Sequence, residues 1–177
     1  MKSFFSDLKL WVCNFIIGYI PSHFVRLSYY KYLMNFKIGD GASIHLGCKF
    51  NTSGKFTMGE NSTINQHCHM DNRGGIYIGK NVSISPFVSI VTADHDLEDE
   101  MCAARTGSVT IDDYVFIGYG AKIFKNVMMG YGSVLGGMSL LTKKTEPYGI
   151  YFGVPATLKR ERRKDLKHTS KYIRMFH

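Results

Sequence analysis

One histidine of the sequence, His95, lies between two carboxylates, Asp94 and Asp96. The surrounding stretch, residues 91–110, holds five of the eleven acidic residues found between positions 38 and 158. An imidazole takes up a proton near neutral pH, which makes His95 a candidate general base. A carboxylate beside the ring would fix its tautomer and stabilise the cation that forms. Asp96 is a candidate catalytic residue on this ground, and the sequence leaves open whether Asp94, Asp96 or a backbone carbonyl orients the ring.

The sequence on both sides of this stretch repeats every six residues. Apolar anchors recur at fifteen positions: Ile38, Ile44, Phe50, Met58, Ile64, Met70, Ile78, Ile84, Ile90, Ile111, Ile117, Ile123, Met129, Leu135 and Leu141. The residue four places after each anchor is small or short, except at Asp94. An ordinary half-buried sheet would alternate every two residues instead. The period of six predicts triangular coils of three short strands, which stack and pair their backbones.

Residues 91–110 interrupt this period. A coil that breaks its own repeat must form an excursion, and loops on a rigid scaffold often carry function. Anchors that start coils at positions 38, 58 and 78 also predict two extra residues near a corner of each early coil. We therefore expect an active-site loop at 91–110, with His95 in it.

Four short segments carry a family resemblance: Thr92 to Asp96, Val115 to Gly118, Leu141 to Lys143 and Gly153 to Ala156. Together they resemble the hexapeptide-repeat acyltransferases over roughly residues 38–160. The resemblance implies a mainly β fold, a left-handed parallel β-helix, and the handedness comes from the family alone. The N-terminal segment makes the chain most similar in type to the sugar O-acetyltransferases of exopolysaccharide and lipopolysaccharide assembly.

The resemblance implies direct transfer of an acetyl group from acetyl-CoA to a saccharide hydroxyl, with His95 as the base. The backbone N–H of Tyr119 would stabilise the thioester oxygen as it becomes negative. Asn65 lies thirty residues before His95 and matches a position that contacts the acceptor sugar. Phe116 replaces the usual Trp, so a stacking contact near the thiol arm is retained without the indole N–H.

The same resemblance implies that coenzyme A lies along the helix edge between two subunits of a homotrimer. Gly118 and Gly137 would let its pantetheine arm approach the backbone closely. Thr142, Lys143 and Arg160 would lie near the nucleotide phosphates. The resemblance implies no metal in this site.

The N-terminal residues show a helical pattern. Apolar residues recur at steps of three or four from Phe4 to Ile20, and Ser22 is predicted to cap a second helix that runs to about Met34. We expect these helices to cover the open strand edge of the first coil. A contact with a membrane surface or a lipid-linked acceptor is the alternative use, and the two uses are compatible.

These patterns divide the chain into three parts. We predict a helical cap at residues 1–37, the β-helix at 38–146, and a C-terminal segment at 147–177. Residues 159–177 are expected to form a basic helix that covers the far end or reaches a neighbouring subunit.

The net charge of +8 is concentrated at the two ends of the chain. Residues 1–37 carry five basic and one acidic residue, residues 159–177 carry eight and two, and the middle carries nine and eleven. A nucleic-acid-binding domain would more often spread cations over a groove, so we exclude that class.

The four cysteines form no CxxC or Cys/His zinc spacing. With no signal-peptide pattern and no apolar run of the about 20 residues that span a bilayer, we expect a cytoplasmic protein. A peripheral contact at the inner face of the membrane is compatible with this location.

Three other functions are alternatives to this one. Amino-sugar N-acetylation would use the same fold and base. A non-catalytic trimeric scaffold at the membrane would not bind coenzyme A. A zinc-dependent carbonic anhydrase is disfavoured, because residues 91–110 supply a single histidine. Cys102 could carry an acyl group, but nothing in its surroundings activates the thiol, so direct transfer is preferred.

Overall fold

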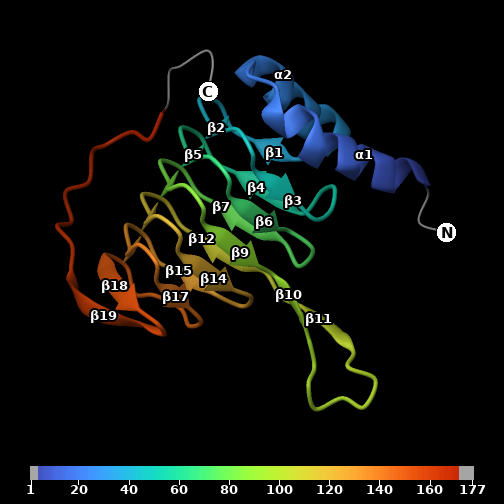
Figure 1. Cartoon of the computed structure of the whole chain (residues 1–177). Coiled ribbons are helices and arrows are strands. Elements are labelled where there is room, and N and C mark those ends of the chain that lie inside the picture. Colours follow the sequence, from blue (N-terminus) through green and yellow to red (C-terminus); the bar gives the residue numbers. More distant parts are fainter. Residues whose placement is uncertain (1–3, 172–177) are drawn as a thin grey trace.

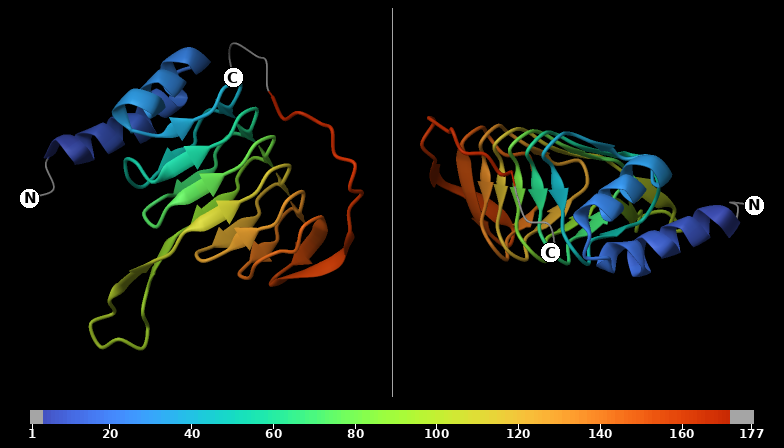
Figure 2. Two further views of the ribbon diagram at one scale, coloured as in Figure 1. Left: turned by 180° about the vertical axis from the view of Figure 1, so that it is seen from behind. Right: turned by 90° about the horizontal axis from the view of Figure 1, so that it is seen from above.

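The computed structural model describes residues 4–171 (Figure 1). It is a parallel β-helix of about six coils, with helices at the N-terminal end and an antiparallel hairpin that projects from one side. The mainly β fold expected from the six-residue period is confirmed. Figure 2 shows the coils stacked along one axis.

The coils have three faces, each a ladder of short strands. The first face contains β1 (Lys37–Ile38), β4 (Phe56–Met58), β7 (Ile76–Ile78), β12 (Val109–Ile111) and β15 (Met128–Met129). The second contains β2 (Ser43–Ile44), β5 (Thr63–Ile64), β8 (Ser83–Ile84), β13 (Phe116–Ile117), β16 (Val134–Leu135), β18 (Gly149–Gly153) and β19 (Ala156–Glu161). The third contains β3 (Lys49–Phe50), β6 (His69–Asp71), β9 (Ser89–Val91), β14 (Lys122–Phe124) and β17 (Leu140–Leu141).

The apolar anchors form the core. All fifteen are buried inside the coils, and parallel pairing places equivalent anchors opposite one another, as with Ile64 and Ile84. Side chains alternate in and out along each strand, so an anchor points into the core and its neighbour points outward. The outward residue is exposed in strands such as β1 and β13, but in β2 and β5 it is buried as well. No coil could bury its anchors alone, which makes the stack the folding unit.

The insertions collect at one corner, where the chain passes from the third face to the first. We call this the loop corner: it contains residues 51–55, 71–75, 92–108 and 125–127. The two extra residues predicted in the early coils lie here. The amide side chain of Asn72 connects two of these loops, accepting from the N–H groups of Asn51 and Thr52 and donating to the carbonyls of Thr52 and Gly54.

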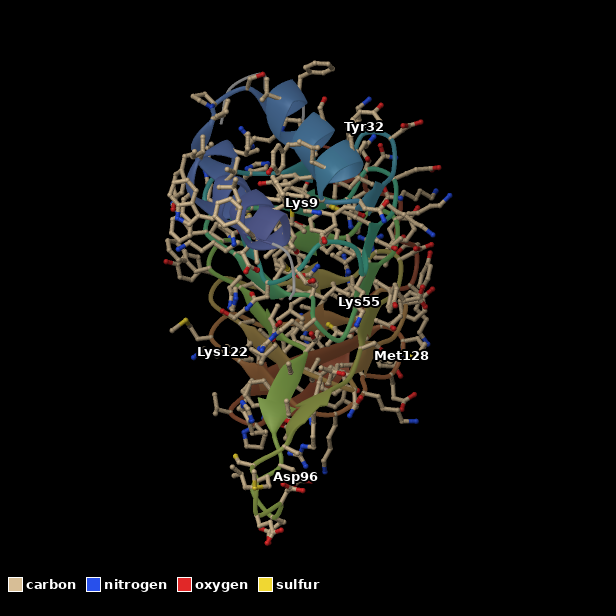
Figure 3. All side chains as sticks on the ribbon, turned by 90° about the vertical axis from the view of Figure 1, so that its right-hand side faces the viewer. Lys9, Tyr32, Lys55, Asp96, Lys122 and Met128 are labelled. Atoms are coloured by element: carbon tan, nitrogen blue, oxygen red, sulfur yellow. The ribbon has the colours of Figure 1, made fainter. Side chains whose placement is uncertain are left out.

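Residues 92–108 are the longest excursion from this corner. They form a two-stranded antiparallel hairpin of β10 (Ala93–His95) and β11 (Ala104–Thr106). In Figure 3, Asp96 lies on this projection, at the end opposite to Lys9 and Tyr32 of the N-terminal helices.

The N-terminal helices cover the first coil. They are α1 (Phe4–Phe15), a 3-10 turn η1 (Ile17–Tyr19), α2 (His23–Ser28) and a π-helical turn η2 (Tyr29–Leu33). The Asn14 amide exchanges two hydrogen bonds with the backbone of Phe50, and the fully buried Arg26 donates to the Ile44 carbonyl. These side chains satisfy backbone groups at the open edge of the first coil. Ser22 occupies the N-cap position of α2, but its side chain makes no capping hydrogen bond.

The outer side of these helices exposes large apolar residues, among them Phe4, Phe5, Trp11, Phe24 and Tyr32. Within residues 4–171, no helix combines the length and the apolar character that crossing a bilayer requires.

The predicted C-terminal helix is wrong for the residues that the structure describes. β18 continues the second face, β19 folds back antiparallel to it, and residues 162–171 then run as an extended segment, which we call the C-terminal strap. The strap has no apolar repeat of 3.6 residues and carries many like charges, so a helix would gain little from packing. Residues 172–177 lie outside the described residues.

The strap returns along the coils to the N-terminal end (Figures 1 and 2). Arg162 donates to the carbonyls of Tyr114 and Gly132 at 3.2 and 3.3 Å. Further on, Thr63 donates to the Ser170 carbonyl at 2.6 Å, and the Ser170 hydroxyl donates to the Asn81 carbonyl at 3.1 Å.

Candidate active site

His95 is exposed on the projecting hairpin, and a backbone carbonyl orients its ring. Nδ1 lies 2.8 Å from the carbonyl oxygen of Cys102. A carbonyl only accepts hydrogen bonds, so Nδ1 carries the proton and Nε2 keeps a free lone pair for an incoming proton. Of the three orienting groups considered from the sequence, the structure supports the backbone carbonyl.

Asp96 does not act on the ring directly. Its carboxylate lies 3.4 Å from Nη1 of Arg105 and accepts the N–H of Glu98 at 3.2 Å. Arg105 in turn donates to the carbonyl of His95 at 3.1 Å. Asp96 therefore helps to hold the hairpin backbone that presents His95, which is a positioning role.

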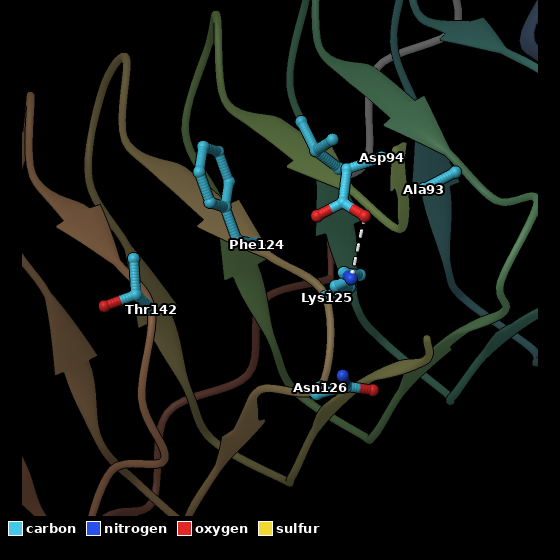
Figure 4. Close-up of a pocket in the computed structure, with 7 residues that line it drawn as sticks. Ala93, Asp94, Phe124, Lys125, Asn126 and Thr142 are labelled. Carbon is cyan, nitrogen blue, oxygen red and sulfur yellow. Dashed lines mark ion pairs between the residues drawn. The ribbon is translucent and has the colours of Figure 1, made fainter. Parts of the chain in front are cut away.

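Asp94 belongs to the opposite side of the hairpin, toward the coils. Lys125 lies 2.8 Å from its carboxylate and Arg105 lies 3.1 Å from it, and these hydrogen bonds hold the pKa of Asp94 below its ordinary value. Figure 4 shows the pair of Asp94 and Lys125 in a cavity of about 360 Å³. The cavity is also lined by Val91, Ala93, Phe124, Asn126 and Thr142.

The base of the hairpin is fixed by a polar network. The Thr92 hydroxyl donates to the carbonyl of Asp71 and accepts the N–H of Gly74 at 2.8 Å. The Thr92 carbonyl accepts the N–H of Gly107 at 2.9 Å. Both strands of the hairpin are thereby tied to the coil beneath, although the hairpin itself adds nothing to the buried core.

Tyr119 lies at a different corner, between the second and third faces. Its carbonyl accepts the N–H of Met138, while no group within residues 4–171 accepts from its own N–H. A Cβ on Gly137 would lie 3.7 Å from the Tyr119 nitrogen, and a Cβ on Gly118 would collide with the nitrogen of Gly137. Glycine at these two positions keeps adjacent coils close and leaves the Tyr119 amide accessible.

Asn65 leads into the same corner. Its side-chain NH₂ donates to the carbonyl of Ile84 at 2.8 Å, which fixes the amide in place. The rings of His67, Phe87 and Tyr119 follow one another along this corner, with centroids 5.2 and 5.3 Å apart.

The predicted phosphate-binding residues fall into two places. Thr142 lines the cavity beside Asp94, and Lys143 is exposed next to it. Arg160 lies instead on the second face, where it shares a cavity of about 410 Å³ with Phe116, Arg162 and Arg163. This arginine group was not predicted, since the sequence showed only a basic tail.

One chain does not bring the predicted catalytic groups together. His95 comes after β9 of the third face, whereas Tyr119 comes before β14 of the same face. The two residues therefore lie at opposite ends of the strands of that sheet. The structure groups His95 with Asp94 and Arg73, and separately groups Tyr119 with Gly118 and Gly137.

Four contributors to the His95 environment were missed: the Cys102 carbonyl, Arg73, Arg105 and Lys125. Arg73 and Lys125 each lie one coil away from the hairpin, at the loop corner. Stacking the coils in register would have placed them there. No cluster of three His, Cys, Asp or Glu side chains suited to a metal ion occurs in the described part of the chain.

The fold of this chain is similar to that of several solved structures. A hexapeptide-repeat acetyltransferase from Vibrio cholerae superposes with a TM-score of 0.83, at 21% identity, over 92% of this chain and 96% of that one. A galactoside acetyltransferase in complex with coenzyme A superposes with a TM-score of 0.78, at 25% identity, over 93% and 86%. The fold is that of the hexapeptide-repeat acetyltransferases. The resemblance read from the sequence is thus confirmed at the level of the fold.

The similarity in amino-acid sequence to known proteins covers much less of the chain than the similarity in fold. No protein-family model matches the chain. A chloramphenicol acetyltransferase from Klebsiella aerogenes is 40% identical over 52 residues, which are 29% of this chain and 25% of that protein. The chain thus spans about a quarter of the length of the curated relatives it matches.

Proposed function

We propose that the protein is an acetyl-CoA-dependent O-acetyltransferase that acts on a saccharide hydroxyl. The observation that carries this proposal is the tautomer of His95, whose Nδ1–H is held by the Cys102 carbonyl while Nε2 is available as a base. Support comes from the similar structures, since the galactoside enzyme holds coenzyme A and the Vibrio protein has been solved with acetyl coenzyme A.

The reaction is a direct transfer. Nε2 of His95 removes the hydroxyl proton as the acceptor oxygen attacks the thioester carbon. The new C–O bond forms, the C–S bond breaks, and the proton passes from the imidazolium to the leaving thiolate. The Cys102 carbonyl stabilises the imidazolium through Nδ1–H, and the Tyr119 N–H donates to the oxygen that becomes negative.

The donor site is proposed along the coil edges. Gly118 and Gly137 leave space for the pantetheine arm beside the Tyr119 amide. Thr142, Lys143 and Arg160 supply polar and cationic groups for the phosphates. Asn65 and Phe116 remain the proposed acceptor and thiol-arm contacts.

A homotrimer would complete the site. Because His95 and Tyr119 lie at opposite ends of the third-face strands, a neighbouring copy must supply one of them. We propose that the hairpin of one subunit reaches the Tyr119 corner of the next. Sedimentation equilibrium tests this, and a monomeric mass in an active preparation would contradict it.

We place the reaction in surface polysaccharide biosynthesis, with a lipid-linked saccharide as the acceptor. The support is the exposed apolar side of α1 and α2, which a bilayer surface would cover. Co-sedimentation with anionic vesicles measures this contact.

The decisive experiment follows coenzyme A release from acetyl-CoA with a panel of saccharides and their amino-sugar counterparts. Transfer to hydroxyl acceptors supports the proposal, whereas transfer confined to amines identifies an N-acetyltransferase. Failure to bind coenzyme A in calorimetry would leave the scaffold alternative instead. His168→Ala, on the C-terminal strap, is the matched histidine control for variants of His95.

A further inference from the structure

The hairpin has two faces with different chemistry. In its register, His95 pairs with Ala104 and Ala93 pairs with Thr106, so these four side chains share one face. A cavity of about 210 Å³ lies on this face, lined by the same four residues together with Arg73 and Asp94. Ligand pockets for larger molecules are about 300–1,000 Å³, so this one suits a single ring or charged group.

Arg73 is held rigidly at the wall of this cavity. Its Nε and Nη2 donate to the two carboxylate oxygens of Asp71 at 2.8 and 3.0 Å. The Asp71 side chain is 1% exposed, whereas that of Arg73 is 50% exposed. Burial opposes ionisation of Asp71, but the hydrogen bonds from Arg73 outweigh it and keep the pKa of Asp71 below its ordinary value. A guanidinium fixed in this way loses little freedom when it binds a ligand.

The pair with Asp71 leaves part of the guanidinium unused. Nη1 of Arg73 makes no hydrogen bond to any residue between 4 and 171, and it can only donate. Ala93 and Ala104 offer no polar side-chain atoms, and the Asp94 carboxylate is bonded to Lys125 and Arg105. Besides His95, Arg73 and the Thr106 hydroxyl can therefore recognise a polar substituent in this cavity, and of these two Arg73 carries the positive charge.

The free N–H groups of Arg73 suit an anion, because Arg73 is the cation that lines this cavity and the other lining charge, Asp94, is paired with Lys125 and Arg105. Lys55 lies outside the lining and donates from Nζ to the Arg73 carbonyl at 2.9 Å. In Figure 3, Lys55 lies on the coils and Asp96 lies on the projecting hairpin. The remaining carboxylates of the hairpin, Glu98, Asp99 and Glu100, follow His95 in the turn beyond it.

We propose that Arg73 binds a carboxylate on the acceptor, so that the acceptor is an acidic sugar whose carboxylate lies near the hydroxyl that His95 deprotonates. A planar guanidinium and a carboxylate match in geometry as well as in charge. This inference deepens the proposed function and rests on it.

The test compares methyl galacturonide with its C6 carboxamide, two glycosides that carry the same hydroxyl groups and differ in the charge at C6. The wild type is expected to acetylate the acidic glycoside with the higher kcat/KM. Arg73→Gln should reduce kcat/KM for the acidic glycoside about 10- to 100-fold more than for the neutral one, the range for a hydrogen bond to a charged group. Arg73→Lys should recover part of the preference. Lys80→Gln, which removes an exposed cation elsewhere on the coils, is the matched control.

Two results would overturn the inference. One is a wild type that shows no preference for the acidic glycoside, and the other is an equal loss on both glycosides in Arg73→Gln, which would mark a structural role.

Binding without acetyl-CoA separates this inference from the proposed function. Ligand-observed NMR of the full chain should show tighter binding of the galacturonide, abolished in Arg73→Gln. That result, with no acetyl transfer to any acceptor, would refute the proposed function and leave the acidic-sugar site standing. Transfer to neutral sugars with no galacturonide binding would do the reverse.

Discussion

The coils and the hairpin are built on opposite principles. In the coils, parallel strands of two or three residues bury their anchors completely, and every coil is packed between neighbours. In the hairpin, two antiparallel strands pair with each other, and β11 is exposed along its whole length. Side-chain hydrogen bonds from Thr92 and Arg105, together with the pair of Lys125 and Asp94, hold it in place.

The difference separates stability from chemistry. Free energy of folding resides in the anchors, while His95, the proposed base, lies on a projection that contributes little to the core. A substitution should therefore affect either the folding of the protein or its turnover, but seldom both.

The largest expected effect on turnover without an effect on folding is that of His95→Ala. Loss of a general base should reduce turnover about 100- to 10,000-fold. Because the side chain is exposed, the free energy of unfolding should change by less than about 0.5 kcal/mol. Turnover is measured by coenzyme A release and stability by urea denaturation. Unchanged turnover would remove His95 from the mechanism.

The converse change is Ile78→Ala, in the core of the first face. Truncation of a buried isoleucine should lower the free energy of unfolding by about 2–5 kcal/mol, since it leaves a cavity between coils. Turnover per folded molecule should stay near the wild-type value. Tyr77→Ala, at the exposed neighbouring position of β7, is the control and should cost far less. Equal losses in the two variants would contradict the assigned core.

A third test affects the donor side of the proposed site. Gly137→Val should place methyl groups near the Tyr119 amide and reduce turnover toward the about 100-fold loss seen when one oxyanion donor is removed. Gly137→Ala should have a smaller effect. Thermal unfolding should shift by only a few degrees in both. A fully active valine variant would exclude the Tyr119 N–H as a donor.

The smallest expected effect is a change in how the stability of the protein depends on pH in the acidic range. Because the pKa of Asp71 is lowered in the folded state, its pair with Arg73 stabilises the protein above the ordinary aspartate pKa of about 4. This stabilisation is lost as the pH falls from that value through the lowered pKa. Asp71→Asn should therefore flatten the dependence of stability on pH in this acidic range, as measured by urea denaturation. An unchanged slope would show that the pair contributes nothing to folding.

The sequence predicted the coils well and the hairpin poorly, for physical reasons. The anchors recur with the period of the structure, so each position followed from its neighbours. The excursion has no period, and only its limits and His95 could be foreseen. The orienting carbonyl of Cys102 could not, because any residue type supplies a carbonyl and only the backbone path decides which one faces the ring. The predicted C-terminal helix was wrong because residues 159–171 are charged without a helical period of apolar residues, and charge does not specify a helix.

The strap also changes how the protein can unfold. In a solenoid each repeat contacts only its neighbours, so terminal repeats fray independently. Here the hydrogen bond from Thr63 to Ser170 joins residues 107 positions apart in sequence. Such non-local contacts slow folding, because a long loop must close before they form. Once closed, the loop couples unfolding of the last coil to unfolding of the second, so a quasi-one-dimensional stack gains cooperativity between its two ends.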